Sequence, residues 1–204
     1  MKFISTLILV WWVGHVYAQL PECVPPKDEA RLVYDMANML QPQEVQQLEQ
    51  NLQSFAQKTS NQIVILTLPD LCGYEPSDLS FKIMDEWGIG QADLDNGVVL
   101  LIKPKTSDSK GQIFIATGRG LEGALPDGKI HLIWENEIIP QFKQNNYYQG
   151  ILNGLTVIEQ LAQKEFDIDT YAKKHKEKKD KGGWVGLLIF GAIALLFIFG
   201  KNRN

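Results

Sequence analysis

Acidic and amide side chains gather in two short segments, and their chemistry is the most readily interpreted in the sequence. Asp93, Asp95 and Asn96 come just before an apolar run, whereas Glu122 follows a second run and Asp127 lies close behind. Carboxylate and amide oxygens are hard ligands that suit Ca²⁺ or Mg²⁺ better than Zn²⁺. If the two segments meet in the fold, these residues predict a divalent-cation site. The alternative is a solvated acidic loop.

The second segment is also rich in glycine. Gly118, Gly120 and Gly123 have the spacing of the G-x-G-x-x-G dinucleotide fingerprint. The fingerprint places its third glycine in a helix and a strand after it, but here Pro126 follows three residues later. We therefore reject NAD binding. The N–H groups of Gly118 and Gly120, together with the Arg119 guanidinium, could instead hold an anion. An ordinary surface role for Arg119 is the alternative.

The remaining reactive residue types form no catalytic pattern. His15, His131 and His175 lie far apart in the sequence, and no G-x-S-x-G motif is present, so acyl transfer has no support. Cys23 and Cys72 do not have metal-site spacing. In an oxidising compartment they could pair and attach the Pro-rich N-terminal segment to the rest of the domain. Two isolated thiols are the interpretation that we prefer.

The hydrophobic pattern predicts the elements that position these residues. Apolar residues recur at helical spacing over about 42–58, over 76–87 and from Pro126 onward. Continuous apolar runs predict strands over 62–68, 98–103 and 112–117. A helix joins the first two strands, which should therefore be parallel, whereas only a polar loop joins the last two. The sequence predicts an α/β domain with a mixed sheet and helices on both faces.

The predicted hairpin has a consequence for the acidic residues. In an antiparallel pair, the start of one strand lies beside the end of its partner. The segment that contains Asp95 and Asn96 enters the first hairpin strand, and the segment that contains Glu122 leaves the second. We therefore expect Asp93, Asp95, Asn96, Glu122 and, close behind, Asp127 at one edge of the sheet.

Charge excludes one class of partner. Residues 19–172 contain 22 Asp and Glu against 11 Lys and Arg, which gives this body a formal charge of −11. Nucleic-acid-binding modules need a basic surface, so the composition argues against DNA or RNA. Divalent cations or a cationic partner surface fit the charge better.

The two ends of the sequence predict how the protein is placed relative to the membrane. Lys2, an apolar stretch and the Val16-Tyr17-Ala18 sequence predict a signal peptide over 1–18. Gly182–Gly200 contains no charged residue and is long enough to cross a bilayer as a helix. We expect a single-pass membrane protein of the cell envelope, with its domain on the extracytoplasmic side.

The segment before the predicted transmembrane helix conflicts with one rule of topology. Residues 173–181 contain six Lys and two acidic residues, and the positive-inside rule would place such a run in the cytoplasm. We give priority to the signal peptide. A solvated linker is the preferred interpretation of this run, and contact with lipid headgroups is the alternative.

Four blocks of sequence resemble the TPM domain family over about residues 31–165. The blocks are Leu32-Val33-Tyr34-Asp35, Trp87-Gly88-Ile89-Gly90, Asp95-Asn96-Gly97-Val98, and residues 118–123 together with Leu125-Pro126-Asp127. The order of a signal peptide, a TPM domain and a C-terminal transmembrane helix is similar to that of many bacterial members. The resemblance implies a three-layer α/β/α sandwich of Rossmann-like topology. It also implies divalent-cation binding at Asp95, Asn96, Glu122 and Asp127, with Asp35 as a further candidate.

The resemblance does not select one activity. Family members include a thylakoid-lumen protein of photosystem II repair with acid phosphatase activity and an accessory protein of nematode acetylcholine receptors. These roles share a domain that works beside membrane complexes. We therefore expect a cation-binding module that assists assembly or repair of envelope proteins, with a metal-assisted acid phosphatase as the alternative. The expected divisions are 1–18 signal peptide, 19–30 Pro-rich segment, 31–172 TPM domain, 173–181 basic linker, 182–200 transmembrane helix and 201–204 cytoplasmic tail.

Overall fold

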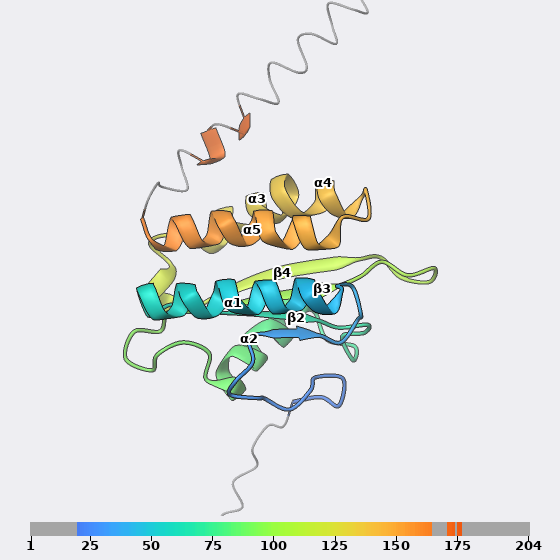
Figure 1. Ribbon diagram of the computed structural model, residues 1–204, viewed down its shortest axis with the longest axis horizontal. Helices are drawn as coiled ribbons and strands as arrows, with labels where there is room; N and C mark the ends of the chain where they lie inside the picture. The colour runs from blue at the N-terminus through green and yellow to red at the C-terminus, as the bar shows by residue number, and fades with distance from the viewer. Residues whose placement is uncertain (1–19, 165–170, 174, 177–204) are drawn as a thin grey trace, which may run out of the picture.

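A four-stranded mixed sheet organises the domain in the computed structural model, which describes residues 20–164, 171–173 and 175–176. The strands lie in the order β1, β2, β3, β4. The first three are parallel, and β4 is antiparallel to β3. Helices pack on both sides of the sheet (Figure 1). The predicted α/β class and mixed sheet are confirmed. The strands are β1 (Val33–Asp35), β2 (Gln62–Thr67), β3 (Gly97–Lys103) and β4 (Gln112–Thr117).

The helices follow the hydrophobic periodicity closely at the start of the domain and less closely toward its end. Both α1 and α2 begin at the proline that the sequence indicated, and α2 ends at the predicted residue. The region from Pro126 onward is divided into several pieces rather than being uniformly helical. The helices are α1 (Pro42–Thr59), α2 (Pro76–Trp87), the 3-10 turn η1 (Arg119–Leu121), α3 (Asp127–Ile133), the π-helical segment η2 (Trp134–Ile138), α4 (Ile139–Phe142) and α5 (Tyr147–Ala162).

Local chemistry explains where α1 begins and which face it buries. Proline is tolerated in the first turn because the N–H it lacks would have no helical partner. The Glu44 carboxylate accepts a hydrogen bond from the Gln41 N–H at 2.8 Å, which satisfies one of the free donors at the helix start. Leu48, Leu52 and Phe55 then bury one face against the sheet. The helix therefore packs on β1 and β2.

The sheet register identifies the face that α2 covers. Tyr34 of β1 and Phe114 of β4 share a row of the sheet, through their register partners on β2 and β3. The Tyr34 ring lies 4.7 Å from the Trp87 ring, and the Phe114 ring lies 5.9 Å from Phe81, between centroids. Both partners belong to α2. Every residue of the central strand β3 is buried, which is typical of a strand covered on both faces.

A π-helical segment between α3 and α4 was not expected from the sequence. Pro140 lacks the N–H that an α-helix would direct at the carbonyl of Asn136. The widened turn over Trp134–Ile138 precedes this proline, and such π segments commonly accompany a disturbed hydrogen-bond ladder. The sequence pattern in this region is apolar and helical, so the proline was the only signal of the interruption.

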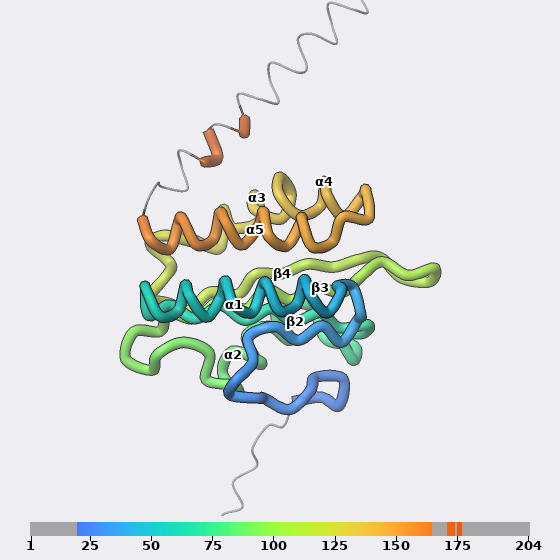
Figure 2. Tube along the Cα trace, viewed as in Figure 1, coloured from blue at the N-terminus to red at the C-terminus, as the bar shows by residue number. Residues whose placement is uncertain are grey.

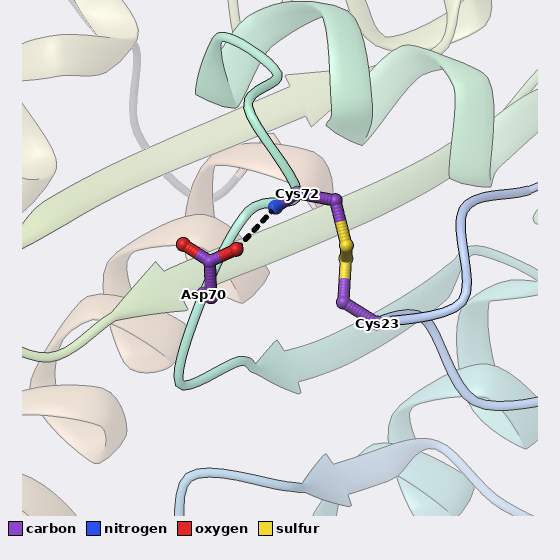
Figure 3. Close-up of a disulfide and its surroundings, with 3 residues drawn as sticks. All are labelled: Cys23, Asp70 and Cys72. Atoms are coloured by element: carbon purple, nitrogen blue, oxygen red, sulfur yellow. Dashed lines mark hydrogen bonds between the residues drawn. A yellow bond between two sulfur atoms is a disulfide. The ribbon is translucent and has the colours of Figure 1, made fainter.

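Cys23 and Cys72 form a disulfide, so the preferred interpretation of two isolated thiols was wrong (Figure 3). The bond attaches the N-terminal segment to the loop between β2 and α2. The Cys72 N–H also donates to an Asp70 carboxylate oxygen at 2.8 Å, which helps to hold that loop. The pairing depends on how the two segments approach each other in space, which spacing in the sequence does not encode.

Glu159 of α5 is half-buried where α5 meets α1, and its position leads to a prediction about stability. A carboxylate oxygen of Glu159 accepts a hydrogen bond from the Asn51 side chain at 2.9 Å. Burial raises the pKa of Glu159 above its ordinary value of 4.5, although the Asn51 bond and the nearby Lys58 charge act in the opposite direction. The folded protein therefore holds this proton more tightly than the unfolded chain, and the ionised form at pH 7 reduces stability.

We expect Glu159→Gln to raise the urea midpoint of unfolding at pH 7, because glutamine is neutral and can still accept the Asn51 hydrogen bond. The advantage should shrink as the pH falls toward 4.5, where the native carboxyl also becomes neutral. Equilibrium unfolding curves of both proteins at several pH values measure this. Glu159→Ala is the control, since it removes the acceptor together with the charge. A Glu159→Gln protein that is less stable at pH 7 would contradict the burial argument.

The predicted signal peptide and transmembrane helix lie outside the described residues, as does most of the basic linker. Within the described part of the chain, no helix combines the length and apolar character needed to cross a membrane. One described piece after α5 does contact the domain. The Tyr171 hydroxyl donates to a Glu137 carboxylate oxygen at 2.9 Å, and His175 lies 3.4 Å from the same oxygen. These contacts attach Tyr171 and His175 to η2.

Candidate functional site

The loop before β3 and the loop after β4 meet at one end of the sheet. The Gly118 N–H donates to the Gly97 carbonyl at 2.9 Å, which extends the β3–β4 pairing by one step. The Gly120 N–H donates to the Asp95 carbonyl, also at 2.9 Å. Figure 2 shows the long loop after α2 at the end of the sheet opposite the β3–β4 hairpin. The antiparallel pairing thus brings together the two segments that the sequence singled out.

Asp95 and Arg119 form an ion pair at this meeting point. The Arg119 Nε lies 3.1 Å from an Asp95 carboxylate oxygen. The Arg119 side chain is 88% exposed and that of Asp95 is 43% exposed, so water screens the pair and it contributes at most about 1 kcal/mol. Asp95 has φ of +47°, a left-handed conformation that aspartate tolerates better than most residues. The predicted anion-binding arginine therefore already has an anionic partner within the domain.

The two glycines on either side of Arg119 allow close packing of the loops. A methyl group at Gly118 would overlap the Asp95 carbonyl oxygen, and one at Gly120 would overlap the Leu94 carbonyl oxygen. Their N–H groups donate to backbone carbonyls of this same edge. A glycine at these positions is required because one backbone approaches another, and the N–H groups predicted to hold an anion already have acceptors.

Asn96 has a structural role in the loop before β3. It is only 5% exposed, and its side-chain amide donates to the Ser60 carbonyl at 2.8 Å and to the Asn61 side chain at 3.2 Å. Its side-chain oxygen accepts the Gln91 N–H at 2.8 Å. These bonds hold the loop before β3 against the end of α1. The amide is thus committed to the fold, and it leaves little capacity for a cation.

Asp35 lies at the opposite end of the sheet from Asp95. Asp35 ends β1, whereas Asp95 precedes β3. Because β1, β2 and β3 run parallel, the end of β1 and the start of β3 lie at opposite ends of the sheet. The Asp35 carboxylate accepts the Met39 and Leu40 N–H groups at 3.0 and 2.9 Å and the Thr67 hydroxyl at 2.6 Å. Asp35 therefore shapes the turn after β1 and does not share a site with the other acidic candidates.

Asp93, Glu122 and Asp127 are exposed near the meeting point of the two loops. Glu122 directly follows the 3-10 turn η1, and Asp127 begins α3. In the part of the chain that the structure describes, no three His, Cys, Asp or Glu side chains are close enough to hold a metal ion. The carboxylates thus share an edge of the domain without forming a compact cage.

An open pocket of about 580 Å³ lies beside the 120–124 loop, at this end of the sheet. The 120–124 loop and the C-terminal ends of α1 and α5 line it, and Lys164 contributes the lining's charged side chain. Helix C-terminal ends carry partial negative charge from their free carbonyl groups. Sequence reasoning did not predict this pocket, because α1 and α5 are about 90 residues apart in the chain.

Comparison with known proteins supports the class that the fold defines, an α/β domain with a mixed sheet. The N-terminal domain of a protein from P. gingivalis is 28% identical in sequence, with a TM-score of 0.57. The match covers 65% of this chain and 82% of that one. The BA42 protein from Bizionia argentinensis is 20% identical in sequence, with a TM-score of 0.51. This match covers 63% of the present chain and 84% of BA42, and it supports the fold alone. No curated protein matches the chain.

The sequence profile of the TPM domain matches residues 33–161, most of the described domain. The protein belongs to the TPM domain family. This confirms the family that the four sequence blocks indicated.

Proposed function

We propose that the protein is a membrane-anchored, extracytoplasmic TPM-domain module. In this proposal it binds a divalent cation, Ca²⁺ or Mg²⁺, and assists assembly or repair of envelope proteins. The predicted signal peptide and the apolar segment Gly182–Gly200 support the anchored topology. The meeting of the Asp95 loop with the 118–123 loop is the observation that carries the cation proposal.

The hydrogen bonds and exposure of the candidate residues reduce the number of side chains that can serve as cation ligands. Asp95, Glu122 and Asp127 carry exposed or half-exposed carboxylates at the same end of the domain, which a hard cation prefers. Asn96 and Asp35 have their polar atoms engaged in hydrogen bonds of the fold. We therefore assign the cation to Asp95, with Glu122 as its second carboxylate ligand, because no three acidic side chains of the described residues lie close enough to share one ion. Asp127 then stays outside the assigned pair. Arg119 competes with the cation for the Asp95 carboxylate.

A metal-assisted acid phosphatase is the second candidate. The guanidinium of Arg119 is highly exposed, and a phosphate could replace Asp95 as its partner. A bound cation would supply the polarisation of a phosphoryl oxygen. Among the described residues, the hydrogen bonds that join the Asp95 loop to the 118–123 loop involve no histidine that could serve a phosphatase as a general base. The cation-binding module therefore needs fewer additional groups than the phosphatase does.

Calorimetric titration of the full-length protein with Ca²⁺ and Mg²⁺, in a mild non-ionic detergent, tests the proposal. We expect Asp95→Asn and Glu122→Gln to weaken cation binding at least about tenfold, because each removes a charged oxygen ligand. Arg119→Gln should strengthen binding about two- to fivefold, because it frees a carboxylate from an exposed ion pair. Asp108→Asn, an exposed aspartate in the hairpin at the other end of the sheet, is the matched control and should bind as the native protein does.

The same samples, assayed with p-nitrophenyl phosphate, separate the two candidates. Turnover that disappears in both Asp95→Asn and Arg119→Gln would favour the phosphatase. Cation binding without turnover favours the module. Binding that is unchanged in Asp95→Asn and Glu122→Gln would refute the assignment of the cation to this edge.

A further inference from the structure

A second open pocket, of about 840 Å³, lies at the opposite end of the sheet, beside the β3–β4 hairpin. Its walls come from the hairpin, η2, α4 and the start of α5. Three lysines line it, Lys103, Lys105 and Lys143, and the described lining contains no Asp or Glu. The body of the protein carries a formal charge of −11, so this pocket is a local reversal of charge. Such a pocket attracts an anionic ligand.

Lys103 is the most unusual of these lysines because it is only 7% exposed. Its ammonium donates to the Ser109 hydroxyl at 2.6 Å and to the Lys110 carbonyl at 3.2 Å, and both acceptors are neutral. Among the described residues, no carboxylate forms an ion pair with it. An ammonium has three donors, so one is left over after these two bonds. A buried charge is costly without a counter-ion, and a bound anion would provide one.

Aromatic side chains form the other part of the lining. Trp134 of η2, Phe142 of α4 and Tyr147 of α5 are all half-buried at the pocket. The rings of Phe142 and Tyr147 lie 5.1 Å apart in an edge-to-face arrangement. Pockets of this volume, with apolar walls and a few polar groups, commonly bind ligands that have an apolar body. The ligand should therefore combine negative charge with an apolar or aromatic group.

The free edge of β4 runs beside the pocket and favours a peptide ligand. The Ile102 carbonyl accepts the Leu68 N–H at 2.9 Å, so the backbone of Ile102 faces β2. Its partner across the hairpin, Ile113, therefore belongs to a pair without mutual hydrogen bonds, and its N–H and carbonyl face outward. Ile113 is half-buried and lines the pocket. An extended peptide can hydrogen-bond to such an edge, whereas a small anion has no use for it.

We propose that this pocket and the adjoining edge of β4 bind an extended acidic peptide segment. The segment pairs with the backbone of Ile113 and places an apolar or aromatic side chain against Trp134 and Phe142. Its carboxylates contact Lys103 and Lys143. The proposal rests on the module function proposed above, since it names the chemistry of a protein partner. It uses the end of the sheet opposite Asp95, however, so the two sites can be tested separately.

Fluorescence anisotropy with the full-length protein tests this site. The probe is a fluorescein-labelled, amidated hexapeptide, Glu-Phe-Glu-Val-Glu-Val, and the charge control has lysine in place of each glutamate. We expect the acidic peptide to bind and the basic one to show no binding. Lys103→Met should weaken binding at least tenfold, and Lys143→Gln, an exposed change that leaves the core intact, about threefold. Lys164→Gln, a lysine at the other end of the sheet, is the matched control and should have no effect.

A backbone-modified probe distinguishes strand pairing from simple charge attraction. The same acidic peptide with every amide between its residues N-methylated keeps every side chain, but neither of its edges has an inter-residue N–H to donate to β4. We expect it to bind at least tenfold more weakly. Equal binding of the methylated peptide, or of the basic peptide, would overturn the proposal. Calcium titration of the same samples keeps the sites apart, because loss of cation binding with peptide binding intact would overturn only the proposed cation function.

Discussion

Gly120→Ala should destabilise the domain by about 3 kcal/mol, because its new methyl group would overlap backbone rather than a movable side chain. The Leu94 carbonyl oxygen occupies the space where a Cβ would lie, and the Asp95 carbonyl oxygen would be in tight contact with that Cβ. The two loops could make room only by separating, and separation would break the hydrogen bond from the Gly120 N–H to the Asp95 carbonyl. Urea unfolding, followed by tryptophan fluorescence, measures the change.

Gly123→Ala provides the matched control in the same loop. A methyl group at Gly123 would meet no atom within 4 Å, and the residue is exposed. We expect a change of less than about 0.5 kcal/mol, as for ordinary surface substitutions. If both variants lose the same amount of stability, the loop is sensitive to any added side chain and close packing is not the cause. If Gly120→Ala is as stable as the native protein, the loops are not packed as described.

The second large effect is expected from the disulfide. Replacement of both Cys23 and Cys72 by serine should reduce the free energy of unfolding by about 2–4 kcal/mol, because the bond closes a long loop in the unfolded chain. The cysteines are 49 residues apart, a separation in the range where the chain-entropy argument gives an effect of this size. Equilibrium unfolding in urea, without reductant, measures the difference.

Reduction of the native protein supplies the control for this prediction. A phosphine reductant should lower the stability of the native protein to that of the double serine variant and leave the variant unchanged. Alkylation of the unreduced native protein, followed by mass spectrometry, should find no modified cysteine. A stability difference that persists between reduced native protein and variant would assign the loss to the serine substitutions rather than to the bond.

The sequence predicted those parts of the fold in which local pattern and tertiary structure agree. The apolar runs of β2, β3 and β4 and the prolines that begin α1 and α2 place these elements to within about one residue at most boundaries. The polar connection between β3 and β4 predicted the hairpin, and the hairpin brought Asp95 to Arg119. These inferences needed only strand length and connection length, which the chain carries locally.

Other features depend on neighbours that no local pattern identifies. β1 has three residues, too few for an alternating pattern, and Asp35 at its end could be located only once its pairing with β2 was known. Asn96 looks like a ligand in the sequence, but it is buried and its side chain is hydrogen-bonded to Ser60 and Asn61 after α1 and to Gln91. The pocket beside the β3–β4 hairpin is lined by Lys103, from the end of a buried strand, and by Lys143, which follows α4. Only the tertiary fold brings these two lysines together, so no local pattern in the sequence indicates it.

The unequal edges of the sheet also limit how many molecules can join. At one border, β1 offers only three residues, and the segment bridged through Cys23 precedes it in the chain. The six residues of β4 form the other border. A guest strand that joined β4 would present its own outer edge, but it would create no matching site at the β1 border. Copies of this protein should therefore not add to one another edge to edge and propagate into fibres.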